Sequence, residues 1–234
     1  MKRLIVNADD FGLSAGVNAG IVQAHRRGIV TSASLMVRQP AAEQAAALAR
    51  RLPRLGVGLH LDLWESVYRD GQWIRLYAWT DEEPAAIERE LQAQLAAFRR
   101  LTGRDPDHLD THQHVHRREP AAAVVAHKAR ALGLPLRGDG TVRYFGGFYG
   151  QDDVGRPYPE GIGVPRLLEL LDALEAGLTE FGCHPGHVGS DEPLGGTAYR
   201  VERNVECRTL CDPRVLARMA RGDIVLANFG GAVR

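Results

Sequence analysis

Carboxylate, imidazole and guanidinium side chains recur where apolar, strand-like segments of this sequence end. The first such segment runs directly into a pair of aspartates, and later segments run into histidines or an arginine. These groups are Asp9 and Asp10, His60, the run from Asp110 to His116, Arg137 and His184. In parallel α/β proteins the loops after the strands converge on one rim, so groups separated by tens of residues are expected to meet there. The recurrence predicts one functional site built from five strand ends.

Histidine nitrogens and carboxylate oxygens are the donors that divalent metal ions take from proteins. Two histidines and one aspartate leave coordination positions for water and substrate, which is typical of a hydrolytic centre. Each group also has a structural interpretation: Asp9 and Asp10 as helix caps, His60 as a core histidine, and His184 as part of a turn. The joint recurrence favours the metal interpretation. No nucleophile elbow, phosphate loop or dinucleotide fingerprint follows a predicted strand, so other chemistry is not favoured.

The segment around residue 110 carries an unusual density of histidines. Five of its polar residues share one parity and would lie on one face of an extended chain: His108, Asp110, His112, His114 and His116. If the segment is helical, His112 and His116 share a face instead. The sequence leaves open whether His114 or His116 joins His112 as a metal ligand.

Apolar strand-like runs alternate with Ala- and Leu-rich helical patterns, which indicates βα units around a parallel sheet. Strands are predicted at 3–7, 31–37, 56–63, 107–111, 134–137, 178–183 and 224–228. Helices are predicted at 15–28, 40–52, 84–101, 120–132, 164–176 and 212–220. A full eight-fold barrel typically needs about 250 residues. We therefore expect one α/β domain over residues 1–234, an irregular, shortened (β/α) barrel with about seven parallel strands, with a doubly wound open sheet as the alternative. The irregular stretch 138–163 is the candidate active-site loop.

The composition excludes several classes of protein. The 234 residues include 29 basic and 29 acidic side chains, so the formal net charge is zero and a broad basic face for nucleic acid is not expected. No apolar run approaches the roughly 20 residues of a membrane-spanning helix. The chain reaches the polar Asn7 too soon for a secretory signal, and three cysteines imply no disulfide framework. We expect a cytoplasmic protein that binds neither nucleic acid nor membranes.

Four motifs then occur in a diagnostic order. They read N-A-D-D-F-G at 7–12, G-L-H-L at 58–61, H-L-D-T-H-Q-H-V-H at 108–116 and C-H-P-G at 183–186. In these motifs the chain resembles the YdjC-type carbohydrate deacetylases, which include the chitooligosaccharide (diacetylchitobiose) deacetylases. The resemblance extends over nearly the whole chain, and the first and third motifs are highly specific. The family is related to the NodB-like polysaccharide deacetylases, and its irregular (β/α) barrel agrees with the predicted strands.

The resemblance implies a metal-dependent hydrolase that removes the N-acetyl group from an amino sugar or a short oligosaccharide such as diacetylchitobiose. The roles it implies are metal ligation by Asp10, His60 and His112, general-base catalysis by Asp9 and general-acid catalysis by His184. It further implies that Arg137 binds a sugar hydroxyl or orients Asp9, and that Asp110 orients a histidine. Amide hydrolysis needs an activated water, an electrophile and a proton donor, and this set of residues supplies all three.

Metal and substrate stay open at this point. Histidine-rich ligation suits Zn²⁺, whereas the family is associated with Mg²⁺. The NodB-like enzymes use both histidines of an H-x-x-x-H pair, which would add His116 to the ligands. The resemblance also implies a small carbohydrate as partner and a homodimer. Two other functions fit the residues: a phosphoesterase-like metallohydrolase with a second metal, and a non-catalytic metal- or sugar-binding protein.

Overall fold

A curled parallel sheet forms the centre of the computed structural model, which describes residues 1–69, 71–192, 194 and 196–231. Its strands are β1 (Lys2–Phe11), β2 (Ser32–Leu35), β3 (Gly56–Leu61), β6 (Leu109–Thr111), β7 (Arg143–Phe145), β8 (Gly177–Cys183) and β9 (Ile224–Leu226). They follow the order β6-β3-β2-β1-β8-β7, and β9 pairs with the first residues of β1. Within the described residues the edge strands β6 and β7 do not pair with each other. The fold is therefore the irregular, shortened barrel that the sequence predicts, open between β6 and β7.

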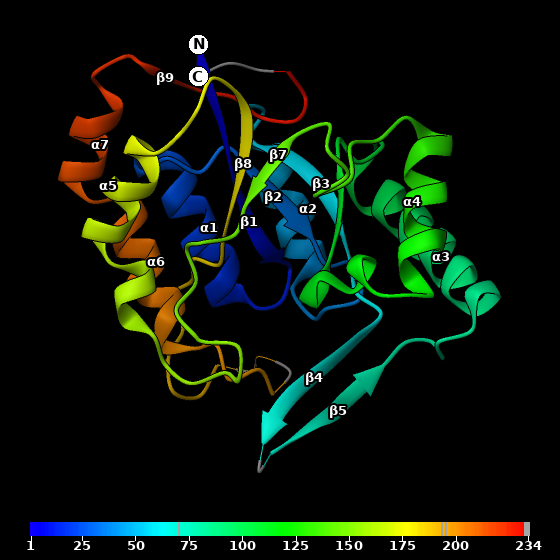
Figure 1. Ribbon diagram of the computed structural model, residues 1–234. Coiled ribbons are helices and arrows are strands. Elements are labelled where there is room, and N and C mark those ends of the chain that lie inside the picture. The colour runs from blue at the N-terminus through cyan, green and yellow to red at the C-terminus, as the bar shows by residue number, and fades with distance from the viewer. Residues whose placement is uncertain (70, 193, 195, 232–234) are drawn as a thin grey trace.

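Helices cover the outside of the sheet. They are α1 (Ala15–Arg27), α2 (Ala42–Arg50), α3 (Pro84–Thr102), α4 (Ala121–Leu132), α5 (Val164–Asp172), α6 (Val201–Leu210) and α7 (Pro213–Met219), with short 3₁₀ turns η1 (His112–Arg117) and η2 (Pro159–Ile162). Figure 1 shows α1, α5, α6 and α7 on one side of the barrel and α3 and α4 on the other. None of the helices in the described ranges is long and apolar enough to cross a membrane.

The two faces of β1 have opposite character because side chains alternate along a strand. Leu4, Val6 and Ala8 face outward and are buried in the core beneath the helices. Asn7 and Asp9 face inward, where the Asn7 amide donates hydrogen bonds of 2.9 Å to Asp9 and to Ser34 of β2. The barrel interior is thus a polar compartment, while the hydrophobic core that stabilises the fold lies between sheet and helices.

Glycines on the inner face make room for large polar side chains. A Cβ atom at Gly58 of β3 would lie 2.4 Å from the ring of His108, and one at Gly182 of β8 would lie 2.9 Å from the Tyr144 hydroxyl. Both separations are too short for a side chain. These two positions therefore allow a histidine and a tyrosine to fill the barrel interior.

A two-stranded antiparallel hairpin, β4 (Trp64–Arg69) and β5 (Gln72–Ala78), leaves the barrel after β3. Figure 1 shows it projecting away from the body of the molecule. No strand or helix is predicted from the sequence in this segment. The base of the hairpin nevertheless returns to the site, because Glu65 is buried beside His112.

Three further differences separate the prediction from the structure. The strand predicted at 134–137 is reduced to a single bridge between Leu109 and Leu136. Strand β7 lies instead within the stretch predicted to be irregular. Helix α6 is not predicted, because its sequence V-E-R-N-V-E-C-R-T-L has no apolar stripe; its buried face carries Glu202, Arg203 and Glu206. That polar face packs toward the site.

Candidate metal centre and active site

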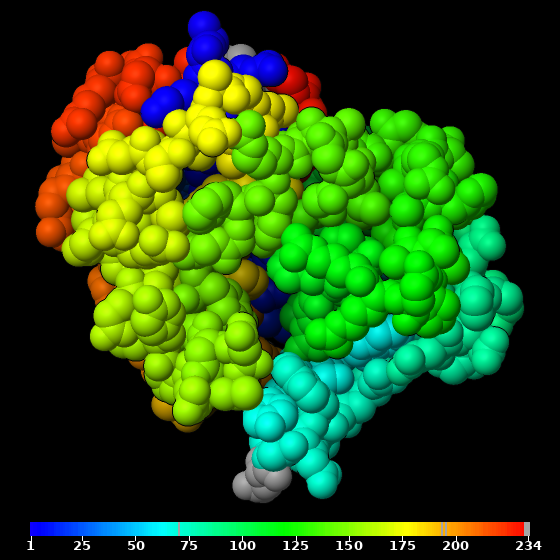
Figure 2. All heavy atoms as spheres, viewed as in Figure 1, coloured from blue at the N-terminus to red at the C-terminus, as the bar shows by residue number. Residues whose placement is uncertain are grey.

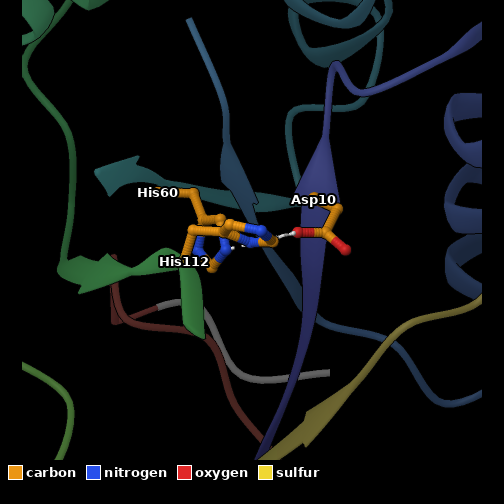
Figure 3. Close-up of side chains that lie close together, drawn as sticks. All are labelled: Asp10, His60 and His112. Carbon is orange, nitrogen blue, oxygen red and sulfur yellow. Dashed lines mark ion pairs between the residues drawn. The ribbon is translucent and has the colours of Figure 1, made fainter. Parts of the chain in front are cut away.

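Three side chains from the ends of three strands converge at the rim of the barrel. Asp10 is the last residue but one of β1, His60 lies in β3, and His112 follows β6 directly. Asp10 Oδ1 lies 3.3 Å from His60 Nε2 and 3.2 Å from His112 Nδ1, and Figure 3 shows both rings pointing toward this carboxylate. The structure thus brings together the three predicted metal ligands, with one donor atom of each within 4.8 Å of the other two.

The environment of these three residues fits a divalent cation. Asp10 Oδ1 is buried and, although both imidazoles approach it, makes no hydrogen bond of regular geometry to the described residues. The outward atom of each ligand is held by a charged residue: His60 Nδ1 lies 2.8 Å from Asp110 Oδ1, and His112 Nε2 lies 2.5 Å from Glu65 Oε2. The second oxygen of Asp10 accepts a 2.6 Å hydrogen bond from Arg203 Nη2. Residues that fix the orientation of metal ligands in this way are typical of metal sites.

The charged groups around Asp10, His60 and His112 also favour a bound cation. Burial alone would lower the pKa of His60, but Asp110 and Asp10 outweigh it and raise this pKa to about 10. The pKa of His112 is raised well above its ordinary value, since Glu65 and Asp10 likewise outweigh burial. Burial would raise the pKa of Asp10, but Arg203 and the two histidines hold it well below its ordinary range. The cluster therefore attracts positive charge, and a bound cation would replace the protons on the two imidazoles.

A local irregularity in β1 sends the two adjacent aspartates to different places. The pairing of β1 with β2 shifts register between Ala8 and Phe11, and Asp10 adopts φ 65° in the left-handed region. A bulge of this kind re-aims side chains at the end of a strand. Asp9 consequently points into the barrel, while Asp10 faces the two histidines at the rim. The two carboxylates are thereby available for different roles, as their adjacency in an extended segment predicts.

Asp9 is held by Arg137. The guanidinium donates two hydrogen bonds to Asp9, of 2.6 and 2.7 Å, and contacts Asp110 at 2.8 Å and Glu180 at 2.7 Å. Burial raises the pKa of Asp9, but Arg137 outweighs it, so this pKa is lowered and the carboxylate is ionised at neutral pH. The Arg137 side chain is 0% exposed, and the Tyr144 ring lies over it at 5.0 Å. This geometry allows Arg137 to orient Asp9, one of its two predicted roles, and it encloses the guanidinium among three carboxyl groups and the Tyr144 ring.

His184 lies on the other side of Asp9. Its Nε2 is 3.9 Å from Asp9 Oδ2, and its ring makes edge or tilted contacts with Tyr149 and Tyr199 at centroid distances of 5.4 and 5.3 Å. Burial lowers the pKa of His184 to about 4. Asp9, the predicted general base, thus has a carboxylate oxygen within 4.8 Å of a ring nitrogen of His60 and lies 3.9 Å from His184, the predicted general acid. Figure 2 shows a hollow in this face of the molecule, with atoms in the dark blue of the N-terminal strand at its floor.

The histidines after β6 follow neither of the two conformations considered from the sequence. Residues 112–117 form a 3₁₀ segment in which Gln113 and His114 both have φ 52°. His116 Nδ1 lies 2.6 Å from Thr111 Oγ1, and His114 Nε2 lies 3.5 Å from the Tyr144 hydroxyl. Within the described residues neither histidine belongs to the cluster of candidate ligands. The break in the backbone, which the sequence does not reveal, turns them away from Asp10.

Several residues that complete the site are missed by the sequence analysis. They are Glu65 from the hairpin, Glu180 from β8, Arg203 and Glu206 from α6, and Tyr199. Glu180 has a signal in the sequence, because a charged residue in the middle of an otherwise apolar strand must find a buried partner. Arg203 and Glu206 are three residues apart, which puts them on one face of a helix, but only when the helix is known to exist.

Comparison with known proteins agrees with these motifs. A family model described as YdjC-like protein matches residues 3–221. The chain belongs to the YdjC-like family. Among its relatives, a carbohydrate deacetylase of Geobacillus stearothermophilus is 38% identical, with 96% of each chain covered. A chitooligosaccharide deacetylase of Serratia marcescens is 34% identical, with 97% of this chain and 98% of the relative covered.

Solved structures share the fold of this family member. A protein of Enterococcus faecalis V583 superposes with a TM-score of 0.79 at 27% identity, with 98% of each chain covered. A family 4 carbohydrate esterase from Streptomyces lividans, solved in complex with acetate, superposes with a TM-score of 0.58 at 12% identity, covering 97% of this chain and 92% of that one. At that identity the second likeness concerns the fold alone, and it supports the barrel described above.

Proposed function

We propose that this protein is a metal-dependent deacetylase that hydrolyses the N-acetyl group of an amino sugar or a short oligosaccharide, with diacetylchitobiose as a representative substrate. The observation that carries the proposal is the convergence of the Asp10, His60 and His112 donor atoms beside a second carboxylate, Asp9, that faces His184. The relatives named carbohydrate deacetylase and chitooligosaccharide deacetylase, which align over nearly the whole chain, supply the reaction class.

Asp10, His60 and His112 would hold one divalent cation, either Mg²⁺ or Zn²⁺. When bound, such a cation supplies a Lewis acid that polarises the acetyl carbonyl and acidifies a water molecule. Asp9, ionised and fixed by Arg137, accepts the proton of the attacking water. His184, across the site from the ligands, protonates the nitrogen as the C–N bond breaks. The acetyl carbon would lie between these two groups.

One observation argues against a second metal. A further group of donor atoms, from Asp9, His60 and Asp110, has the spacing of a metal site. Arg137 already lies in it, because its guanidinium contacts both Asp9 and Asp110. The arginine therefore supplies the positive charge that a second metal would supply in a phosphoesterase-like enzyme. A binding protein without catalysis would need neither the Arg137-held Asp9 nor His184.

The direct test is acetate release from diacetylchitobiose by the purified protein, after chelation and restoration with Mg²⁺ or Zn²⁺ one at a time. We expect activity with at least one cation, and its loss in Asp9→Asn and in His184→Ala. His127→Ala is the matched control, since His127 is exposed on α4, outside the site. Full activity of Asp9→Asn would reject the proposed base, and full activity in the presence of chelator would reject metal dependence. A small carbohydrate partner, a homodimer and a cytoplasmic location belong to the same proposal.

A further inference from the structure

The carboxyl group of Glu206 is buried behind His184. Glu206 is 0% exposed on α6. Its Oε2 accepts a hydrogen bond from the backbone N–H of His184, and its Oε1 accepts one from the Tyr199 hydroxyl. Oε1 also lies 3.9 Å from His184 Nδ1. The two ring nitrogens of His184 thus face two different carboxyl groups, Asp9 on the Nε2 side and Glu206 on the Nδ1 side.

The surroundings of Glu206 join three segments of the chain. The Tyr199 hydroxyl accepts a 2.9 Å hydrogen bond from the Gly150 N–H while it donates to Glu206. The Tyr149 ring stacks on Tyr199 at 4.6 Å and contacts the His184 ring edge-on. Helix α6, the end of β8 and the long loop after β7 therefore meet at this carboxyl group.

The role assigned to His184 under the proposed function leaves one proton unaccounted for. His184 Nδ1 is buried and has no hydrogen-bond partner among the described residues. Because burial lowers the pKa of His184 to about 4, the ring is neutral at pH 7 and carries one proton. A neutral imidazole can give up its Nε2 proton without becoming an anion only if Nδ1 takes up another.

The environment of Glu206, next to this nitrogen, favours the protonated form of its carboxyl group. Burial raises the pKa of Glu206 to about 8, even though Tyr199, the His184 N–H and Arg203 act in the opposite direction. The protonated form therefore predominates at neutral pH. The titratable and charged groups that face Glu206 are Asp9 from β1, Cys183 and His184 from the end of β8, Tyr149 from the loop after β7, and Tyr199 and Arg203 at α6.

We propose that Glu206 is the positioning residue and proton store of His184, and that the two act as a relay toward the leaving nitrogen. This inference rests on the proposed deacetylation. The 3.9 Å gap is longer than a hydrogen bond, so the relay requires a small rotation of the His184 ring, which contacts the rings of Tyr149 and Tyr199.

Each proton in the relay can be followed. Water gives one proton to Asp9 as its oxygen bonds to the acetyl carbon. As the C–N bond breaks, the nitrogen takes the proton from His184 Nε2, and His184 Nδ1 takes the proton from Glu206. The imidazole stays neutral and changes tautomer, Glu206 becomes a carboxylate, and the products are acetic acid and the amine. Asp9 then loses its proton to solvent and Glu206 regains one, so the cycle is balanced.

The test measures kcat of Glu206→Gln and of the wild type on two substrates. The leaving group of one substrate must be protonated, and that of the other need not be. The amide of diacetylchitobiose has a poor leaving group that must be protonated, whereas 4-nitrophenyl acetate releases a stable phenolate. Because a positioned acid contributes about 10²–10⁴-fold, we expect kcat for the amide to fall by at least about 100-fold and kcat for the ester to change less than about threefold. The rate of ester hydrolysis measured with Asp9→Asn is taken as the background and subtracted. Glu169→Gln, on the exposed face of α5, is the matched control and should leave both rates unchanged.

Equal loss on both substrates, or no loss on the amide, would overturn the relay. If Glu206→Gln does not fold, the wild-type protein decides: kcat for the amide should fall as the pH rises above about 8, where Glu206 loses its proton, while kcat for the ester should not. A flat amide profile would also overturn the inference. Failure of the wild type to release acetate with any cation is a different result, because it rejects the proposed function itself together with this step.

Discussion

The two halves of the site are held in place by different means. On the ligand side, His60 and His112 each have a carboxylate within 2.8 Å of the outward ring nitrogen, and Asp10 is paired with Arg203. On the other side, the His184 ring is held by aromatic contacts and lies 3.9 Å from the nearest oxygens of Asp9 and Glu206. A group that binds a cation must keep its geometry, whereas a group that passes protons must be able to move. The difference in restraint fits the difference in proposed roles.

The largest expected effect comes from the ligand side. In Asp10→Asn the donor facing the two histidines loses its charge and the buried Arg203 loses its partner. Loss of a residue that only orients a metal ligand reduces metal affinity by up to about 100-fold. We expect a larger fall in cation affinity for Asp10→Asn, and acetate release should fall with it. Isothermal titration with Zn²⁺ and Mg²⁺ measures the affinity. Wild-type affinity in Asp10→Asn would show that the cation binds elsewhere.

Arg137 connects the two halves, and its removal should affect folding as well as activity. Arg137→Met would leave Asp9, Asp110 and Glu180 buried without the guanidinium that pairs with all three. Breaking a buried pair by removing one partner is strongly destabilising, so we expect a loss of about 3–5 kcal/mol in the free energy of unfolding. Urea denaturation measures it. Arg166→Met removes an exposed pair with Glu169 and should change stability by less than about 1 kcal/mol. Similar losses in the two variants would contradict a buried network.

The partner of His112 gives the next smaller effect. Glu65→Gln removes the charge 2.5 Å from His112 Nε2 but keeps the size of the side chain. Loss of such an outer partner typically reduces metal affinity by about 10–100-fold, and we expect that range here. Titration with the cation is again the measurement. Glu88→Gln on the exposed face of α3 is the control, and an effect as large as that of Asp10→Asn would make Glu65 a ligand itself.

The candidate ligands are visible in the sequence, whereas the residues that orient them are not. Most of the predicted strands are present, and Asp10, His60 and His112 lie close together as expected, because each lies in a short motif at the end of an apolar run. The residues that orient them come from distant segments: Arg203 is 193 positions from Asp10 in the chain. Helix α6 buries a polar face, so its pattern lacks the apolar stripe that identifies a helix. The turn at Gln113 and His114 requires a left-handed backbone at both residues. Neither residue is a glycine, so the sequence gives no sign of this conformation.

The smallest effect should come from the loosely held side and should leave cation binding unchanged. Tyr199→Phe keeps the ring that stacks on Tyr149 but removes the hydroxyl between Glu206 and the Gly150 N–H. Glu206 thereby loses one hydrogen bond, worth about 1–1.5 kcal/mol. We expect kcat on the amide to fall by about tenfold as a result. Cation affinity should stay at the wild-type value, because Tyr199 contacts none of the three ligands in the described structure. Parallel measurement of kcat and cation affinity in this one variant separates the two halves. A joint fall would mean that they form a single rigid unit.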